Sequence, residues 1–288
     1  MGRKKIVFIL VLSIIVISAV VSWTGISSND GQGTYQYETI RGEKVTIYGK
    51  GLYKHMSAEV AIQGIAQDYV TLFIAIPLLI ISLILYYKGS MRGRLLLTGV
   101  LSYFFITYLF YLAMAMYNEF FLLYAFLMGV SFFSITIMFM SFDIIKLSCL
   151  FCNNTPVKFV GGFLIFNAFA IAMLWLSIVV PPLLNGSIYP KELEHYTTLI
   201  VQGMDLGLLL PLATVSGALL FMKKPLGYLI GSVYSIFLMI LMIALTGKVI
   251  AMGMAGYNII PVIFIIPSFG IISIICNILL LKNVGSNE

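Results

Sequence analysis

Long runs of apolar residues alternate with short polar segments along the chain. Each run has about the twenty residues that an α-helix needs to cross the hydrocarbon core of a bilayer. The runs cover residues 6–23, 69–87, 95–117, 120–142, 159–184, 199–222, 226–247 and 259–281. This pattern predicts an all-α membrane protein with eight transmembrane helices, whose short links make successive helices antiparallel neighbours.

The composition of the chain excludes other classes of protein. Hydrophobic residues make up 61% of the chain, charged residues only 10%, and the mean hydropathy is +1.05. Soluble domains carry about 25% charged residues, so this chain cannot face water on all sides. The net charge of +6 does not indicate a nucleic-acid partner, because basic residues in membrane proteins normally report orientation. The expected partner is the lipid bilayer, and the oligomeric state stays open.

The chain divides into four segments. They are a first transmembrane helix (1–23), an exterior loop (24–58), helices two to four with a cytoplasmic loop (59–158), and helices five to eight (159–288). A basic start before a short apolar run is also typical of a signal peptide, but the length of the run and Trp23 favour a retained helix or uncleaved signal anchor. In the exterior loop, β-forming residues alternate around the turn at 41–44, which predicts a small β-hairpin. This hairpin could be a lid, a partner contact or a packed connector.

Basic residues gather on one side of the predicted membrane. If the amino terminus is cytoplasmic, the cytoplasmic segments contain 11 of the 17 Lys and Arg residues but only two acids, Asp143 and Glu288. The basic residues on that side are Arg3, Lys4, Lys5, Lys88, Arg92, Arg94, Lys146, Lys158, Lys223, Lys224 and Lys282. The positive-inside rule therefore predicts that both termini lie in the cytoplasm.

Two stretches, 55–87 and 195–222, have the same layout. Each begins with a histidine and continues with Gln-Gly, an aspartate and a proline inside the apolar run, and each is followed by a similar run (LLLTGVLSYF and YLIGSVYSIF). One interpretation is a 4+4 duplication with parallel halves, as some transporters have. The other is chance similarity between apolar segments, because nine residues separate Asp68 from Pro77 but only six separate Asp205 from Pro211.

Ionisable and amide side chains near these helices are the candidate site. Ionisable groups inside lipid are costly and usually face the bundle interior or a wet cavity. The candidates are Asp205, Gln202, Asp68, Gln67, Gln63, Glu59, Glu119 and Lys248. We expect an outward-facing pocket for a cation, a proton or a small polar solute, with Lys248 at the end of its helix closing it. The alternative for the acids is helix capping, because carboxylates are favoured at helix amino termini.

Several of these positions have a more specific expected geometry. Asp205 lies roughly 9 Å below the outer boundary of its helix, at 1.5 Å per residue. Glu59, Gln63 and Gln67 are spaced by four residues and therefore share one face of a helix. The pair Pro181-Pro182 is expected to end the fifth helix at its outer side.

No metal or cofactor is predicted. Cys149 and Cys152 have the C-x-x-C spacing of metal and redox sites, but a closed zinc site needs four ligands and the predicted cytoplasmic segments contain no further Cys or His. His55 and His195 have no spaced partners and are expected to be interfacial anchors.

A resemblance adds to this interpretation. The segment 197–228 contains Gln-x-x-Asp-Leu-Gly, a basic turn and Pro-x-Gly-Tyr, and it resembles a stretch in a family of prokaryotic multi-span membrane proteins that have no established activity. The stretches YGKGLYKHMSAEVAIQGIAQDYVTL and KGSMRGRLLLTGVLSYF are similar to the first half of that family. The resemblance implies a prokaryotic cell membrane and draws attention to Gln202, Asp205, Gln67 and Asp68. It implies no substrate and no catalytic residue.

The leading functional interpretation is a transporter or permease for a small solute or ion. Asp205 and Asp68 would bind the substrate or a coupling ion, with Gln202 and Gln63 as hydrogen-bonding partners. The alternative is a membrane-embedded sensor or binding protein that acts through a partner chain. A membrane enzyme comes third, because the chain has no phosphate loop, nucleophile elbow or zinc-protease motif.

Overall fold

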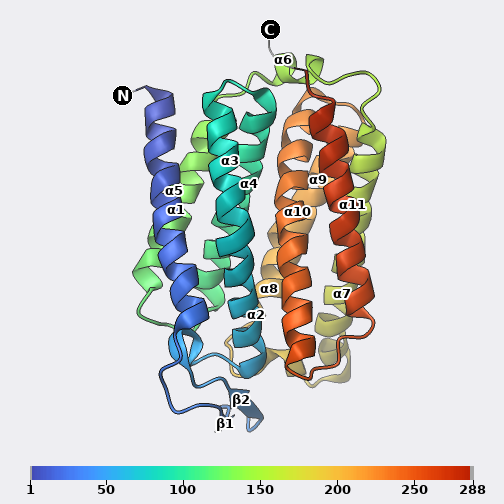
Figure 1. The fold of residues 1–288 in the computed structure, drawn as a ribbon. Helices are drawn as coiled ribbons and strands as arrows, with labels where there is room; N and C mark the ends of the chain where they lie inside the picture. The colour runs from blue at the N-terminus through green and yellow to red at the C-terminus, as the bar shows by residue number, and fades with distance from the viewer. Residues whose placement is uncertain (1, 286–288) are drawn as a thin grey trace.

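The apolar runs form long helices that stand side by side, with a small sheet at one end (Figure 1). The structure is a computed structural model that describes residues 2–285, so the predicted segment ends at 1 and 288, and Glu288 itself, lie outside the described residues. Within residues 2–285, eight helical segments are long and apolar enough to cross a membrane. They are α1 (Arg3–Ser27), α2 to α3 (Ala58–Tyr87), α4 (Met91–Met114), α5 (Phe121–Phe139), α7 (Val157–Asn185), α8 to α9 (Ile200–Phe221), α10 (Pro225–Met254) and α11 (Val262–Lys282). The chain is therefore a multi-pass membrane protein, as predicted.

The polar segments form small elements at the two ends of the bundle. The predicted hairpin is confirmed: β1 (Tyr35–Glu38) and β2 (Lys44–Ile47) pair antiparallel. Its turn contains Gly42, whose φ of +81° is a conformation that glycine adopts without strain. The other small elements are η1 (Gly51–Tyr53), α6 (Ile144–Cys149) and η3 (Lys191–Leu193). The short helix α6 was not expected from the sequence.

The helices pack as two groups that meet in the centre. In the first group α1 packs against α3 and α5, and α4 packs against α3 and α5. In the second group α7 packs against α9 and α11, and α10 packs against α9 and α11. The two groups meet where α10 packs against α4 and α2. The start of α1 and the end of α11 lie at one end of the bundle, and the hairpin lies at the other, which we call the hairpin end (Figure 1).

Two spanning helices contain a π-helical turn just ahead of a proline. Helix α2 passes through η2 (Thr71–Ala75) into α3 (Ile76–Tyr87), and α8 passes through η4 (Asp205–Leu209) into α9 (Leu210–Phe221). A proline lacks the N–H group and crowds the preceding turn, and a local π-turn is one adjustment that satisfies the freed backbone groups in membrane helices. Each π-turn and the helix after it begin 134 residues later in the second stretch than in the first: η2 at 71 and η4 at 205, α3 at 76 and α9 at 210. The same offset of 134 residues separates Pro77 from Pro211.

Two expectations about helix ends are wrong. Helix α7 continues through Pro181 and Pro182 to Asn185 and ends at Gly186, whose φ of +77° allows a left-handed cap. The last two turns of α7 therefore accommodate both prolines, although each lacks the N–H donor and crowds the preceding turn. Likewise Lys248 does not end its helix, because α10 runs on to Met254. Lys248 therefore lies within α10, in the wall of the bundle, rather than in a loop.

Helices α7 and α9 approach each other through glycines. A Cβ atom built on Gly161 would lie 2.5 Å from the carbonyl oxygen of Gly217 and 2.8 Å from the backbone nitrogen of Phe221. A Cβ atom on the neighbouring Gly162 would meet nothing within 4 Å. Small residues at such contacts let helix backbones pack closely in membranes.

We predict that Gly161→Ala destabilises the protein by about 1–3 kcal/mol, because the added methyl group overpacks a contact between two backbones. Gly162→Ala is the matched control, and should be neutral or stabilising by up to about 1 kcal/mol, since alanine is the better helix former. Thermal unfolding in detergent measures both. Equal melting temperatures for the two variants would contradict the close packing of α7 on α9.

Candidate functional site

A cavity of about 610 Å³ opens between the two groups of helices. Its walls come from α2, α4, α7, α8 to α9, α10 and α11. On α10 the lining residues extend from Met252, near the hairpin end, to Tyr234, which corresponds to about 27 Å along the axis at 1.5 Å per residue. The cavity therefore reaches from the hairpin end to the middle of the bundle. Its volume is in the range of small-molecule sites, roughly 300–1,000 Å³.

Most of the cavity wall is apolar, and its polar groups are few. Leucine, isoleucine, valine and methionine side chains dominate, together with aromatic rings. The charged and amide side chains in the wall are Glu59, Gln63, Gln67, Asn167, Asp205, Lys248 and Asn258. An apolar cavity with a small number of placed polar groups is the usual form of a ligand site.

Asp205 and Lys248 bring opposite charges to this cavity. The Oδ2 atom of Asp205, in the first position of η4, accepts a hydrogen bond of 2.7 Å from the indole Nε1 of Trp175 on α7. Lys248 projects from the lining face of α10, and its charge interacts with both Asp205 and Asp68. Within residues 2–285 the Nζ atom of Lys248 makes no ion pair within 4 Å. Its ammonium group is therefore available to a negatively charged ligand group.

Asn167 is a polar group deep in the cavity that the sequence analysis missed. It lies on α7, is only 2% exposed and lines the cavity. Its Nδ2 atom has no hydrogen-bond partner among the described residues. A buried donor without a partner is costly, and a ligand acceptor would satisfy it. The rule that singled out Asp205, a polar residue inside an apolar run, would also have found Asn167.

The predicted stripe on α2 is present. Glu59, Gln63 and Gln67 all line the cavity. Gln67 donates a hydrogen bond of 2.6 Å to the hydroxyl of Tyr103 on α4, and this hydroxyl also lies 2.9 Å from Oγ1 of Thr71. These bonds join α2 to α4 at the point where η2 begins.

Asp68 lies behind the cavity wall rather than on it. Its Oδ2 atom accepts a hydrogen bond of 2.5 Å from the hydroxyl of Tyr53, and Oδ1 accepts one of 3.0 Å from Tyr111. Both tyrosines line the cavity, but Asp68 does not. On its other side the carboxylate packs against Gly25 of α1, where a Cβ atom would overlap with Oδ2. Gln202, in α8, is also outside the cavity lining.

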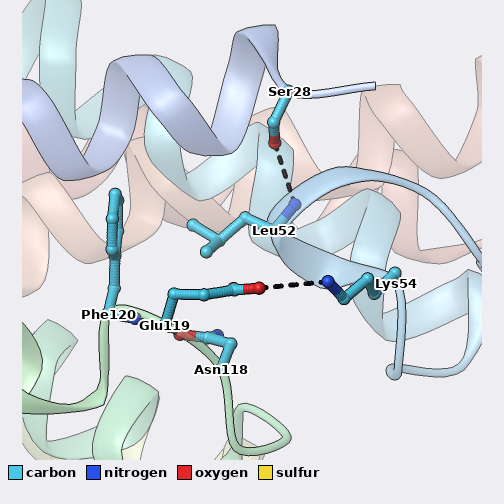
Figure 2. Close-up of polar contacts among 6 residues, drawn as sticks. All are labelled: Ser28, Leu52, Lys54, Asn118, Glu119 and Phe120. Carbon is cyan, nitrogen blue, oxygen red and sulfur yellow. Dashed lines mark hydrogen bonds and ion pairs between the residues drawn. The ribbon is translucent and has the colours of Figure 1, made fainter. Parts of the chain in front are cut away.

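Glu119 lies at the surface of the hairpin end. Its Oε1 atom is 3.0 Å from Nζ of Lys54, so the turn between α4 and α5 is held against the segment that follows the hairpin (Figure 2). Close by, Ser28 accepts a hydrogen bond from the backbone N–H of Leu52 (Figure 2). A hydrogen bond from its own backbone N–H and the bond from Lys54 lower the pKa of Glu119. This residue therefore fastens a loop and is not part of the cavity.

Two loops meet at the hairpin end beside the cavity. The guanidinium of Arg41, in the hairpin turn, donates hydrogen bonds to the carbonyls of Glu194 and Tyr196. The Nε2 atom of His195 lies 3.1 Å from the carbonyl oxygen of His55. Since a carbonyl can only accept, His195 donates there, and its Nδ1 atom is buried with no partner in the described part of the chain. The loop that carries the hairpin is thus joined to the loop between α7 and α8.

We predict that acid weakens this junction through His195. Burial, with a further contribution from Arg41, lowers the pKa of His195 below its ordinary value of 6.5. The neutral ring is therefore favoured in the folded protein, and its stabilising contribution is complete above pH 6.5 and is lost as the pH falls through the lowered pKa. Melting temperatures measured from pH 8 to pH 5 should fall more for the wild type than for His195→Gln.

The control for this prediction is His55→Gln, because His55 contributes only its backbone oxygen to the junction. This variant should keep the pH dependence of the wild type. If His195→Gln and the wild type lose stability in parallel, His195 does not carry the effect.

Comparisons with protein-family models, with curated proteins and with solved structures give no match. The chain is a multi-pass membrane protein whose apolar cavity is lined by Glu59, Asp205 and Lys248 and, within residues 2–285, by a buried amide that has no hydrogen-bond partner.

Proposed function

We propose that this protein transports small organic solutes that have an apolar body and a charged or polar head, and that the cavity is their binding site. The observation that carries the proposal is the combination of a largely apolar wall with Lys248, Asp205 and the amide of Asn167, whose Nδ2 atom has no partner in the described part of the chain. The apolar wall suits the body of the solute. Lys248 suits a carboxylate, Asp205 suits an ammonium group, and Asn167 suits an acceptor held deep in the cavity.

The two interrupted helices support transport over static binding. The π-turn η4 begins at the cavity residue Asp205, and η2 begins at Thr71, which touches the cavity residue Tyr103. In transporters, interrupted helices form the substrate site near the bilayer midplane, and one group of helices rocks against the other around that site. A small change of angle at either π-turn would open or narrow the cavity.

A 4+4 duplication also supports this proposal. The constant offset of 134 residues pairs Pro77 with Pro211, Ser82 with Ser216 and Gly93 with Gly227. The glycines make corresponding contacts, since a Cβ atom on Gly93 would meet Leu85 and one on Gly227 would meet Leu219. The offset also pairs Met114 with Lys248, and both line the cavity. We infer parallel halves related by an axis along the membrane normal, with the cavity between them.

We propose that the hairpin end faces the exterior and that both termini lie in the cytoplasm of a prokaryotic cell. The basic residues Arg3, Arg92 and Lys224 lie at the end opposite the hairpin, as the positive-inside rule expects of a cytoplasmic side. The cavity would then be open to the outside in this conformation. A sensor that acts through a partner chain is the other function that an outward-open site allows.

Three related solutes test the proposal. Phenylalanine carries both charges on an apolar ring, 3-phenylpropionate lacks the ammonium group and 2-phenylethylamine lacks the carboxylate. A solute that binds the folded protein stabilises it by mass action, by about 2.7 kcal/mol at a concentration one hundred times its Kd, and thereby raises the melting temperature. We expect Lys248→Met to abolish stabilisation by 3-phenylpropionate, and Asp205→Asn to abolish stabilisation by 2-phenylethylamine.

The matched control is Glu119→Gln, which lies outside the cavity and should keep every response of the wild type. Uptake of a stabilising solute into proteoliposomes then separates transport from sensing, because a sensor would bind the solute without accumulating it. Stabilisation that persists in both Lys248→Met and Asp205→Asn would overturn the cavity as the solute site.

A further inference from the structure

A second cluster of polar groups lies behind the cavity wall, where α1, α2, α4 and α5 meet. Its centre is Asp68, which is 1% exposed and makes no ion pair within 4 Å in residues 2–285. Ser22 of α1 lies beside the carboxylate. Ser22 Oγ and the hydroxyls of Tyr108 and Tyr124 are buried and lack hydrogen-bond partners in the described chain. One buried carboxylate is thus surrounded by hydroxyl groups with unused hydrogen-bonding capacity.

We propose that Asp68 is a proton-binding site that exchanges protons with the cavity through the hydroxyls of Tyr53 and Tyr111. An ionised carboxylate that is buried without a cation is costly, and taking up a proton removes that cost. The role of this site as the coupling site rests on the proposed transport function. Proton binding itself does not depend on that function.

A proton fits this site better than a metal cation. A bound cation needs space and several oxygen ligands directed at one point. Gly25 packs so closely against Oδ2 that even a methyl group would overlap with it, and both carboxylate oxygens already accept hydrogen bonds from tyrosines. A proton needs only an acceptor for the new O–H group, and the tyrosine oxygen beside each carboxylate oxygen can accept it.

The two tyrosines provide the path. Tyr53 and Tyr111 line the cavity, and each donates a hydrogen bond to one oxygen of Asp68. When Tyr111 passes its proton to Oδ1, it takes a proton from a hydronium ion in the cavity. One O–H bond forms on Asp68 and one on Tyr111, one breaks on Tyr111 and one breaks on the hydronium ion, which leaves water. The net change is one proton moved from the cavity to Asp68.

Four neighbouring elements, η1, α4, α5 and α10, present charged or titratable groups to Asp68. They are Tyr53 from η1, Tyr103, Tyr108 and Tyr111 from α4, Tyr124 from α5 and Lys248 from α10. Helix α1 contributes Ser22 and Gly25, which carry no charge. Lys248 interacts electrostatically with both Asp68 and Asp205. When a proton neutralises Asp68, the positive charge of Lys248 interacts with Asp205 and with a bound solute alone. Binding of the proton and of the solute is therefore coupled, and such coupling is reciprocal.

Infrared difference spectroscopy of the full-length chain in liposomes, recorded between alkaline and acidic pH, tests the site directly. A protonated carboxyl group in apolar surroundings gives a C=O band separate from those of exposed acids. We expect this band in the wild type, in Asp205→Asn and in the surface control Glu119→Gln, and its loss in Asp68→Asn. A band that persists in Asp68→Asn would overturn the proposal.

A second variant covers the case that Asp68→Asn fails to fold. Tyr111→Phe keeps the carboxyl group but removes its hydrogen bond at Oδ1, so the band should shift in frequency. An unshifted band would overturn the assignment to Asp68. Replacing choline chloride with sodium chloride at constant pH tests whether the site binds a cation instead. An unchanged band supports proton binding. Loss of the band in sodium chloride would overturn the proton site in favour of a cation site.

These results separate the two proposals. The infrared measurement uses no solute, so a band assigned to Asp68 supports the proton site even if none of the three phenyl solutes binds. Conversely, solute stabilisation that depends on Lys248, together with no band from Asp68, would leave the cavity proposal intact and overturn the proton site.

Discussion

The structure depends on the requirement that every backbone N–H and C=O group inside a membrane finds a partner within the protein. Long helices meet this requirement almost everywhere along the chain. Prolines interrupt the regular bonding inside α7 and α11 and just after the π-turns η2 and η4. Side chains add bonds beside both π-turns: Tyr234 donates to the backbone carbonyl of Leu209 in η4, and the hydroxyl of Tyr103 bonds with the side chain of Thr71 in η2. Asp205, one of the polar groups that line the cavity, begins η4.

Most of the fold could be predicted from the sequence, because span length and hydrophobicity are local properties. The eight apolar runs and the hairpin could be predicted without knowing any contact between residues that are distant in the sequence. The sequence did not predict that α7 continues through Pro181 and Pro182, because that depends on the cap at Gly186. Nor did it predict the π-turns, since a proline in a membrane helix can be accommodated in several ways.

The candidate site was predicted only in part, for geometric reasons. Asp68 and Asp205 look equivalent in the sequence, since each follows a Gln-Gly pair, but the offset set by the prolines pairs Asp205 with Thr71 and Asp68 with Gln202. The two aspartates therefore have different surroundings, Trp175 and the cavity for Asp205, tyrosine hydroxyls and α1 for Asp68. Glu119 was included because it is acidic and near a helix end, whereas its partner Lys54 is distant in sequence. Partners of this kind cannot be inferred from spacing.

The glycine in the last turn of α1 has a consequence for the part that this helix plays in the bundle. Gly25 covers the carboxylate of Asp68 on the side away from the cavity, and the buried face of α1 continues through Ser22, Ser18 and Ile14. If a peptidase removed this helix as a leader, the carboxylate would be left facing lipid acyl chains. The first helix therefore acts as a seal between this carboxylate and the lipid, where an ionisable group would be costly.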